Sequence, residues 1–75
     1  MNTYKLTGTY KRQGAIGRAV SMIRIVRAET ARQAMDTNRA NLYSAGYDHI
    51  LHKAVYIRIG RKWYAIDMMT ALGMA

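Results

Sequence analysis

Hydrophobic and polar positions in this chain repeat with two periods, one typical of strands and one typical of a helix. Residues 3–11 alternate strictly, which predicts a strand with one covered side. Its inward positions are Tyr4, Leu6, Gly8 and Tyr10. Gly8 either leaves room for a helix or marks a bulge. Residues 50–59 alternate in the same way and predict another half-covered strand, with Val55, Ile57 and Ile59 facing inward.

Two further strands are less regular. Residues 19–28 are apolar on both sides, with Ile23 and Ile25 facing one way and Val20, Met22 and Val26 the other. Either both sides of this strand are covered or a bulge changes its register. Residues 60–62 predict a turn because they begin with glycine, and residues 63–66 then form a brief strand.

One main helix is predicted over residues 30–45. Thr30 is a suitable N-cap, and Gln33 can reach back to the Thr30 N–H in a capping box. Gly46 suits the left-handed position after a helix. The helical period places small and apolar residues on one face, namely Ala31, Ala34, Met35, Asn38, Leu42 and Ala45. A short C-terminal helix over residues 68–72 is predicted after Asp67.

The order strand, strand, helix, strand, strand, short helix predicts an α+β fold. We expect one compact basic domain over residues 1–75, with a mostly antiparallel sheet of about four strands packed on the main helix. The turn 60–62 and the loop 11–18 should lie at opposite ends of this sheet, because the helix returns the chain between the two hairpins. Residues 47–49 are expected to be a short connection.

Charge is the strongest compositional signal. The 75 residues include 12 Lys and Arg against 4 Asp and Glu, a net charge of +8. Such an excess favours an anionic partner: RNA, DNA or an acidic protein surface. No apolar run is long enough to cross a membrane, and residues 1–10 lack the apolar core of a signal peptide. We therefore expect a cytoplasmic protein without a membrane partner.

Catalysis, a metal site and a bound cofactor are not expected. The chain has no Cys and only two His, His49 and His52. Three positions apart on a strand, they face opposite sides and cannot easily share a metal. Neither paired carboxylates nor a glycine-rich nucleotide fingerprint occurs.

Three groups of residues are candidates for binding the anionic partner. Glycine-flanked cations in the loop 11–18 and in the turn 60–62 can contact phosphates. Tyr and Arg side chains on the open side of the sheet can stack on unpaired bases. The candidates are Lys11, Arg12, Arg18, Arg24, Tyr56, Arg58, Arg61, Lys62 and Tyr64.

These features predict a nucleic-acid-binding module without enzymatic activity. The alternative is a small accessory protein, of the kind frequent in phages and mobile elements, that binds and inhibits or modulates a larger acidic protein. Self-association through the sheet is a third possibility. Ordinary solvated loops and an ordinary wet sheet face would carry the same residues.

Overall fold

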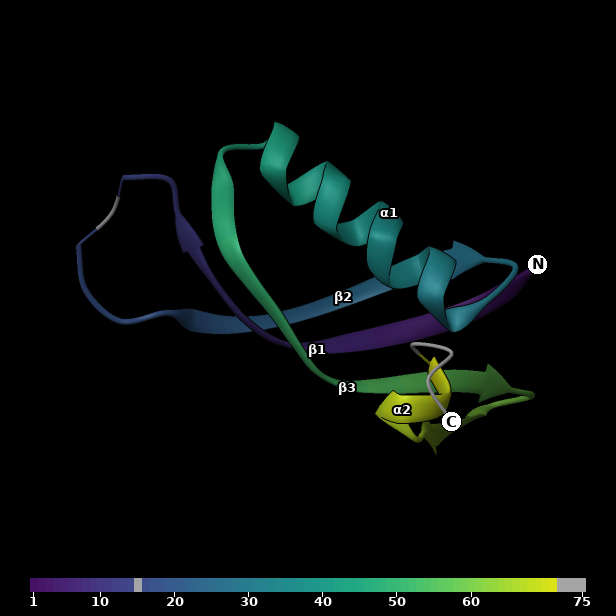
Figure 1. Ribbon diagram of the computed structural model, residues 1–75. Helices are drawn as coiled ribbons and strands as arrows, with labels where there is room; N and C mark the ends of the chain where they lie inside the picture. Colours follow the sequence, from purple (N-terminus) through teal and green to yellow (C-terminus); the bar gives the residue numbers. More distant parts are fainter. Residues whose placement is uncertain (15, 72–75) are drawn as a thin grey trace.

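The computed structural model describes residues 1–14 and 16–71 and confirms the α+β fold with ββαββ order (Figure 1). Its elements are β1 (Asn2–Arg12), β2 (Val20–Ala28), α1 (Ala31–Ser44), β3 (Tyr47–Ile59), β4 (Lys62–Ile66) and α2 (Met68–Ala71). The four strands form one antiparallel sheet in the order β2-β1-β3-β4. Neither helix in this part of the chain has the length and apolar content needed to cross a bilayer.

The helix α1 forms where its capping residues predict it. The Thr30 hydroxyl accepts a hydrogen bond from the Gln33 N–H at 3.1 Å. The Gln33 side chain accepts from the Glu29 N–H at 2.7 Å, one residue earlier than expected. The helix ends at Ser44, and Gly46 then adopts a φ of 93°, which glycine tolerates without a Cβ clash.

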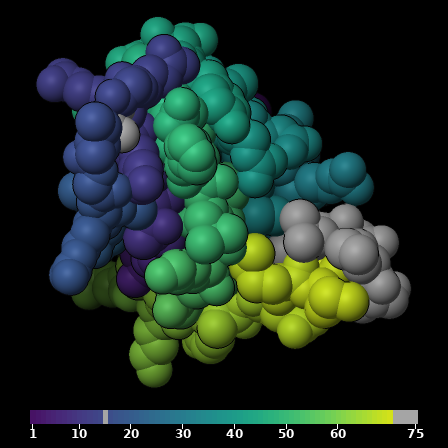
Figure 2. All heavy atoms as spheres, turned by 60° about the vertical axis from the view of Figure 1, so that its left-hand side comes forward, coloured from purple at the N-terminus to yellow at the C-terminus, as the bar shows by residue number. Residues whose placement is uncertain are grey.

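The core lies between α1 and one side of the sheet, here called the helix face. Small residues on α1 let it lie close to the strands, and the space-filling view shows α1 in teal lying against β3 in green (Figure 2). One cluster of buried side chains comprises Tyr4, Leu6, Ala28, Ala34, Met35 and Val55. A second comprises Met22, Leu42 and Ile50, with Tyr10 and Tyr47 packed against it. Ile59, expected to face inward, is exposed at the end of β3.

Gly8 lies where β3 comes unusually close to β1. A Cβ built at Gly8 would lie 1.8 Å from the backbone oxygen of Leu51. The register between β1 and β3 shifts at this point, between Thr7 and Gly8. The glycine therefore marks a bulge, and the close neighbour is a strand, not the helix.

The expectation that residues 47–49 form a connection is wrong. Tyr47 and Asp48 already pair with Arg12 and Lys11, so β3 begins at Tyr47. The long strand β1 supplies partners for these residues, and a second register shift with a positive φ at His49 accommodates their irregular pattern. At the other end of the chain, α2 starts at Met68 behind Asp67, which accepts from the Thr70 N–H at 3.1 Å. Leu72, the expected last residue of that helix, lies outside the described residues.

Candidate nucleic-acid interface

The side of the sheet that points away from α1, here called the outer face, is left open by the described part of the chain (Figure 1). The pairing of β1 with β2 is continuous, so residues opposite one another share a face. Met22 and Val26 turn toward α1, whereas Ile23 and Ile25 turn to the outer face, where they are 71% and 63% exposed. Neither alternative for this strand therefore holds: β2 has no bulge against β1, and residues 1–14 and 16–71 leave its outer side uncovered.

Lys5 lies on the outer face, where its ammonium group contacts two aromatic rings. It is opposite Ile25 of β2 and opposite Tyr56 of β3. Its Nζ atom is 4.7 Å from the ring centroid of Tyr56 and 5.1 Å from that of Trp63 on β4. We call Lys5, Tyr56 and Trp63 the aromatic cluster. A cation–π contact near solvent is worth only about 0.5–1 kcal/mol, so the ammonium is held weakly.

Two arginines lie near the aromatic cluster, and the acidic residues lie elsewhere. Arg58 is opposite Trp63 on β4, and Arg27 is opposite Thr3 at the same end of the sheet. The four acidic residues are Glu29 and Asp67, at the starts of the two helices, Asp36, on α1, and Asp48, opposite Lys11 at the far end. The end of the outer face that carries the two rings is therefore cationic.

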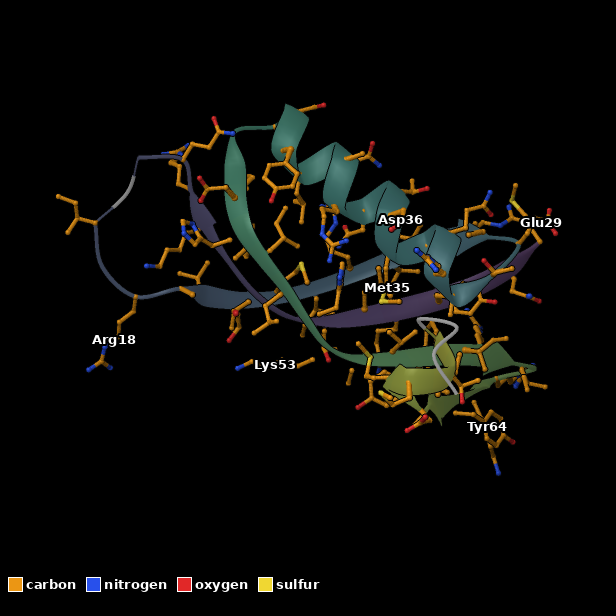
Figure 3. The ribbon with its side chains drawn as sticks, viewed as in Figure 1. Arg18, Glu29, Met35, Asp36, Lys53 and Tyr64 are labelled. Atoms are coloured by element: carbon orange, nitrogen blue, oxygen red, sulfur yellow. The ribbon has the colours of Figure 1, made fainter. Side chains whose placement is uncertain are left out.

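The cations expected at the two connections lie far apart, as predicted. Lys11 and Arg12 end β1, and Arg18 belongs to the connection between β1 and β2. Arg61 belongs to the turn between β3 and β4, and Lys62 begins β4. These connections are at opposite ends of the molecule, whose longest dimension is 39 Å (Figure 1). In Figure 3, Arg18 lies at one end of the molecule and Tyr64 lies near the other end. One small anion cannot bridge them.

Arg24 was expected on the open side of the sheet, and this placement is wrong. It pairs with Leu6 and therefore lies on the helix face. There its Nε–H donates to Oδ1 of Asn38 at 3.2 Å. This hydrogen bond to a buried amide on α1 holds the guanidinium toward the helix. Arg24 is not part of the outer face.

Tyr64 was expected beside Tyr56 and Arg58, and this placement is also wrong. The turn between β3 and β4 contains only Gly60 and Arg61, because Lys62 already pairs with Ile59. A turn shorter by one residue moves every side chain of the following strand to the other face. Tyr64 therefore shares the helix face with Ile57, and Lys62 likewise lies on that face.

Lys5, Arg27 and Trp63, which lie on the outer face in or near the aromatic cluster, were not among the candidates. Strict alternation in residues 3–11 already places Lys5 on the open side. A two-residue turn would have indicated Trp63, and once Met22 is assigned to the helix face, parity along β2 assigns Arg27 to the outer face. Tyr56 and Arg58 lie on the outer face as expected.

A buried polar chain crosses the helix face. Asn38 is fully buried, and because its Oδ1 accepts from Arg24, its Nδ2 turns to Nε2 of His52 at 3.0 Å. A terminal nitrogen of Arg39 lies 3.5 Å from Nδ1 of His52. Burial first, and then the positive charge of Arg39, lower the pKa of His52 below its ordinary 6.5, with Asp36 opposing them in part.

Stability should therefore fall in mildly acidic solution. Below pH 6.5 the unfolded chain protonates His52 while the folded protein resists it, so the free energy of unfolding decreases as the pH falls until the folded-state pKa is reached. The slope is at most about 1.4 kcal/mol per pH unit for one proton. Urea unfolding between about pH 5 and 7.5 measures it. His52→Gln should flatten the slope, and an unchanged slope in this variant would contradict the assignment.

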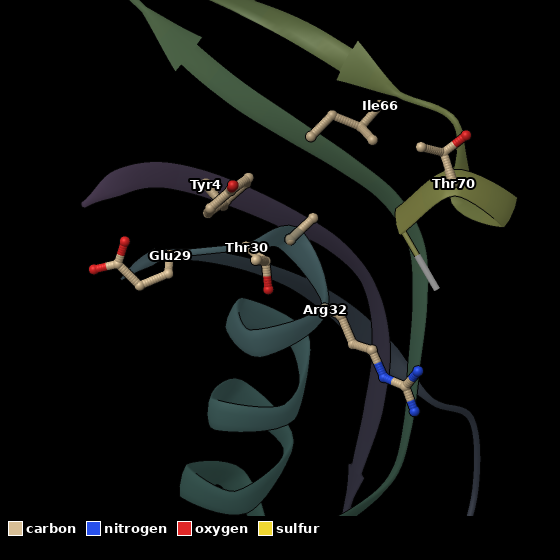
Figure 4. A pocket seen from close by; sticks show the side chains of 7 residues that line it. Tyr4, Glu29, Thr30, Arg32, Ile66 and Thr70 are labelled. Atoms are coloured by element: carbon tan, nitrogen blue, oxygen red, sulfur yellow. The ribbon is translucent and has the colours of Figure 1, made fainter. Parts of the chain in front are cut away.

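A pocket of about 440 Å³ opens on the helix face between the start of α1, β4 and α2 (Figure 4). Its lining residues are Tyr4, Glu29, Thr30, Ala31, Arg32, Ile66 and Thr70. The sheet separates this pocket from the aromatic cluster. Among the described residues, no group of three or more His, Asp or Glu side chains is arranged to hold a metal ion.

No family model, no curated protein and no solved structure matches the chain.

Proposed function

We propose that this protein is a nucleic-acid-binding module without enzymatic activity, which binds through its outer face. The proposal rests on the aromatic cluster, where two rings and an ammonium lie half-buried on an open sheet with Arg27 and Arg58 nearby. Aromatic rings stack on bases, and cations bind the phosphates that connect them. The net charge of +8 provides the long-range attraction.

The energies of the competing contacts favour exchange of Lys5 for a base. Stacking of a base on an aromatic side chain is worth about 1–3 kcal/mol, against about 0.5–1 kcal/mol for each contact of the ammonium with a ring. A base that displaces Lys5 from Tyr56 or Trp63 therefore gains more than the protein loses. The freed ammonium, on its long flexible stem, can then bind a phosphate.

The cationic connections extend this site along the sheet. Lys11, Arg12 and Arg18 lie at one end of the molecule and Arg61 at the other. A nucleic-acid strand that follows the long axis of 39 Å reaches both ends, as a small anion cannot.

Binding should depend steeply on salt. Four phosphate contacts on a single strand correspond to a slope of roughly −3 in log affinity against log salt, about a 50-fold loss between 50 and 200 mM. Fluorescence anisotropy with labelled RNA and DNA oligonucleotides measures this slope. The double variant Arg27→Gln, Arg58→Gln should make the slope shallower by about 1.4.

A matched control is Arg32→Gln, which removes a cation from the exposed side of α1 and should leave the slope unchanged. Absence of binding to any oligonucleotide at low salt, or a slope near zero, would overturn the proposed function.

A second candidate is an accessory protein that binds a larger acidic protein through the same face. One observation favours it: Ile23, Ile25 and Leu51 lie on the outer face and are more than half exposed, at 71%, 63% and 54%. Apolar side chains gathered on one face are typical of protein interfaces. A pull-down divided into nuclease-treated and untreated halves separates the candidates. A stoichiometric protein that survives nuclease and is lost on Ile23→Ser would favour this alternative.

A further inference from the structure

We infer that the ligand of the outer face is single-stranded nucleic acid, with one base stacked on Tyr56 and the next on Trp63 after Lys5 has moved off both rings. This inference rests on the proposed function and specifies its ligand. Tyr56 pairs with Ala65 and Trp63 with Arg58, so the rings are diagonal neighbours on adjacent strands. Side chains in that relation are about 7–8 Å apart, which is within reach of two successive unstacked bases.

The shape of the site prevents a duplex from stacking its bases on the same two rings. In a double helix the faces of the bases are covered by their neighbours in the stack, so rings on a surface cannot reach them. Strands about 4.8 Å apart make this four-stranded sheet about 14 Å wide before side chains are counted. The major groove of DNA is about 12 Å wide and admits one helix or two strands. The outer face is therefore too broad to enter a groove.

The exposed side of α1 is a poor alternative for duplex binding. Asp36 lies in the middle of that side, and Arg39 is 3.8 Å from it in an ion pair. A carboxylate at that position repels the phosphates on either side of a groove. The free faces of unpaired bases, in contrast, match the open rings of the aromatic cluster.

The aromatic cluster also provides its own reporter. Trp63 is the single tryptophan of the chain, so the tryptophan emission of the protein comes from the proposed stacking site. Lys5 contacts this ring in the free protein. Replacement of the ammonium by a stacked base should quench the emission.

The test is a titration of the full chain with single strands of about 12 nucleotides, RNA and DNA in separate arms, and with the matching duplexes. We expect quenching of Trp63 by single strands and at least about tenfold weaker binding of the duplexes. Anisotropy should show that Trp63→Leu and Tyr56→Leu each lower single-strand affinity roughly 5- to 100-fold. Trp63→Tyr should restore much of that affinity, which a merely structural role for the side chain does not predict.

The control variant is Tyr43→Leu, which removes an exposed ring from α1 on the opposite side of the sheet and should not change affinity. Thermal unfolding monitored by circular dichroism establishes that each variant is folded. Duplex affinity equal to single-strand affinity, or single-strand binding without a change in Trp63 emission, would overturn this inference and leave the proposed function standing. Failure of all four oligonucleotides to bind at low salt would overturn both.

Discussion

Gly8→Ala should destabilise the protein by about 3 kcal/mol or more, because the new methyl group has no room. The Cβ position is 1.8 Å from the Leu51 oxygen and 2.9 Å from the Leu51 carbonyl carbon, both atoms of the β3 backbone. Backbone in the centre of a sheet cannot move aside as a flexible side chain can. A domain of 75 residues has roughly 4–11 kcal/mol of total stability, so this single methyl removes a large share.

Urea unfolding followed by circular dichroism measures this loss. Gly60→Ala is the matched control, since Gly60 has a φ of 64° but a methyl group added there would meet no atom within 4 Å. It should cost only about 1–2 kcal/mol, the penalty of a left-handed conformation for alanine. A loss at Gly8 no larger than that at Gly60 would show that the β3 backbone can move aside for the new methyl group.

Asn38→Ala should cost about 3 kcal/mol. It leaves the buried Nε2 of His52 without its donor, removes the acceptor of Arg24 and opens a cavity at a fully buried position. Asn41→Ala, at an exposed position of the same helix, should change stability by less than about 0.5 kcal/mol. A loss of similar size in both variants would mean that Asn38 matters for the helix alone and not for the polar chain.

Asn38→Asp tests the same buried polar chain by adding a negative charge to it. A carboxylate facing His52 stabilises the imidazolium and should raise the pKa of His52 above its unfolded value of 6.5. Stabilisation by this group is then present below about pH 6.5 and lost as the pH rises through the folded-state pKa, the reverse of the natural chain. Unfolding curves at pH 6 and pH 8 show, for each protein, whether the free energy of unfolding rises or falls with pH. If the stability of the variant still falls as the pH falls, as in the natural chain, the new charge lies too far from His52 to act on it.

Local signals in the sequence were sufficient for the helix and for the order of the elements. Thr30 and Gly46 mark both ends of α1, and the period of Ala34, Met35 and Leu42 identifies its buried side. These signals lie within a few residues of the structure they determine. The same holds for the alternation of β1, which correctly separates Tyr4 from Lys5.

The faces of β2 and β4 depend on distant or very small features, so the candidate site was only partly predictable. One residue in the length of the turn decides whether Trp63 or Tyr64 reaches the outer face. In β2, apolar side chains occur on both sides, and the decisive feature for Arg24 is an amide on α1, 14 positions along the chain. The alternation of polar and apolar residues reveals neither the length of the turn nor the position of the amide on α1.

The position of β1 in the middle of the sheet has a consequence for folding during synthesis. β1 is made before its partners, and β3, which pairs Ile57 with Tyr4, leaves the ribosome about 50 residues later. Until then the hairpin of β1 and β2 has a bare inner edge with unpaired N–H and C=O groups. Contacts this distant in sequence form slowly. Such an edge invites pairing with other nascent chains, and the positive charges on these strands counter that tendency by mutual repulsion.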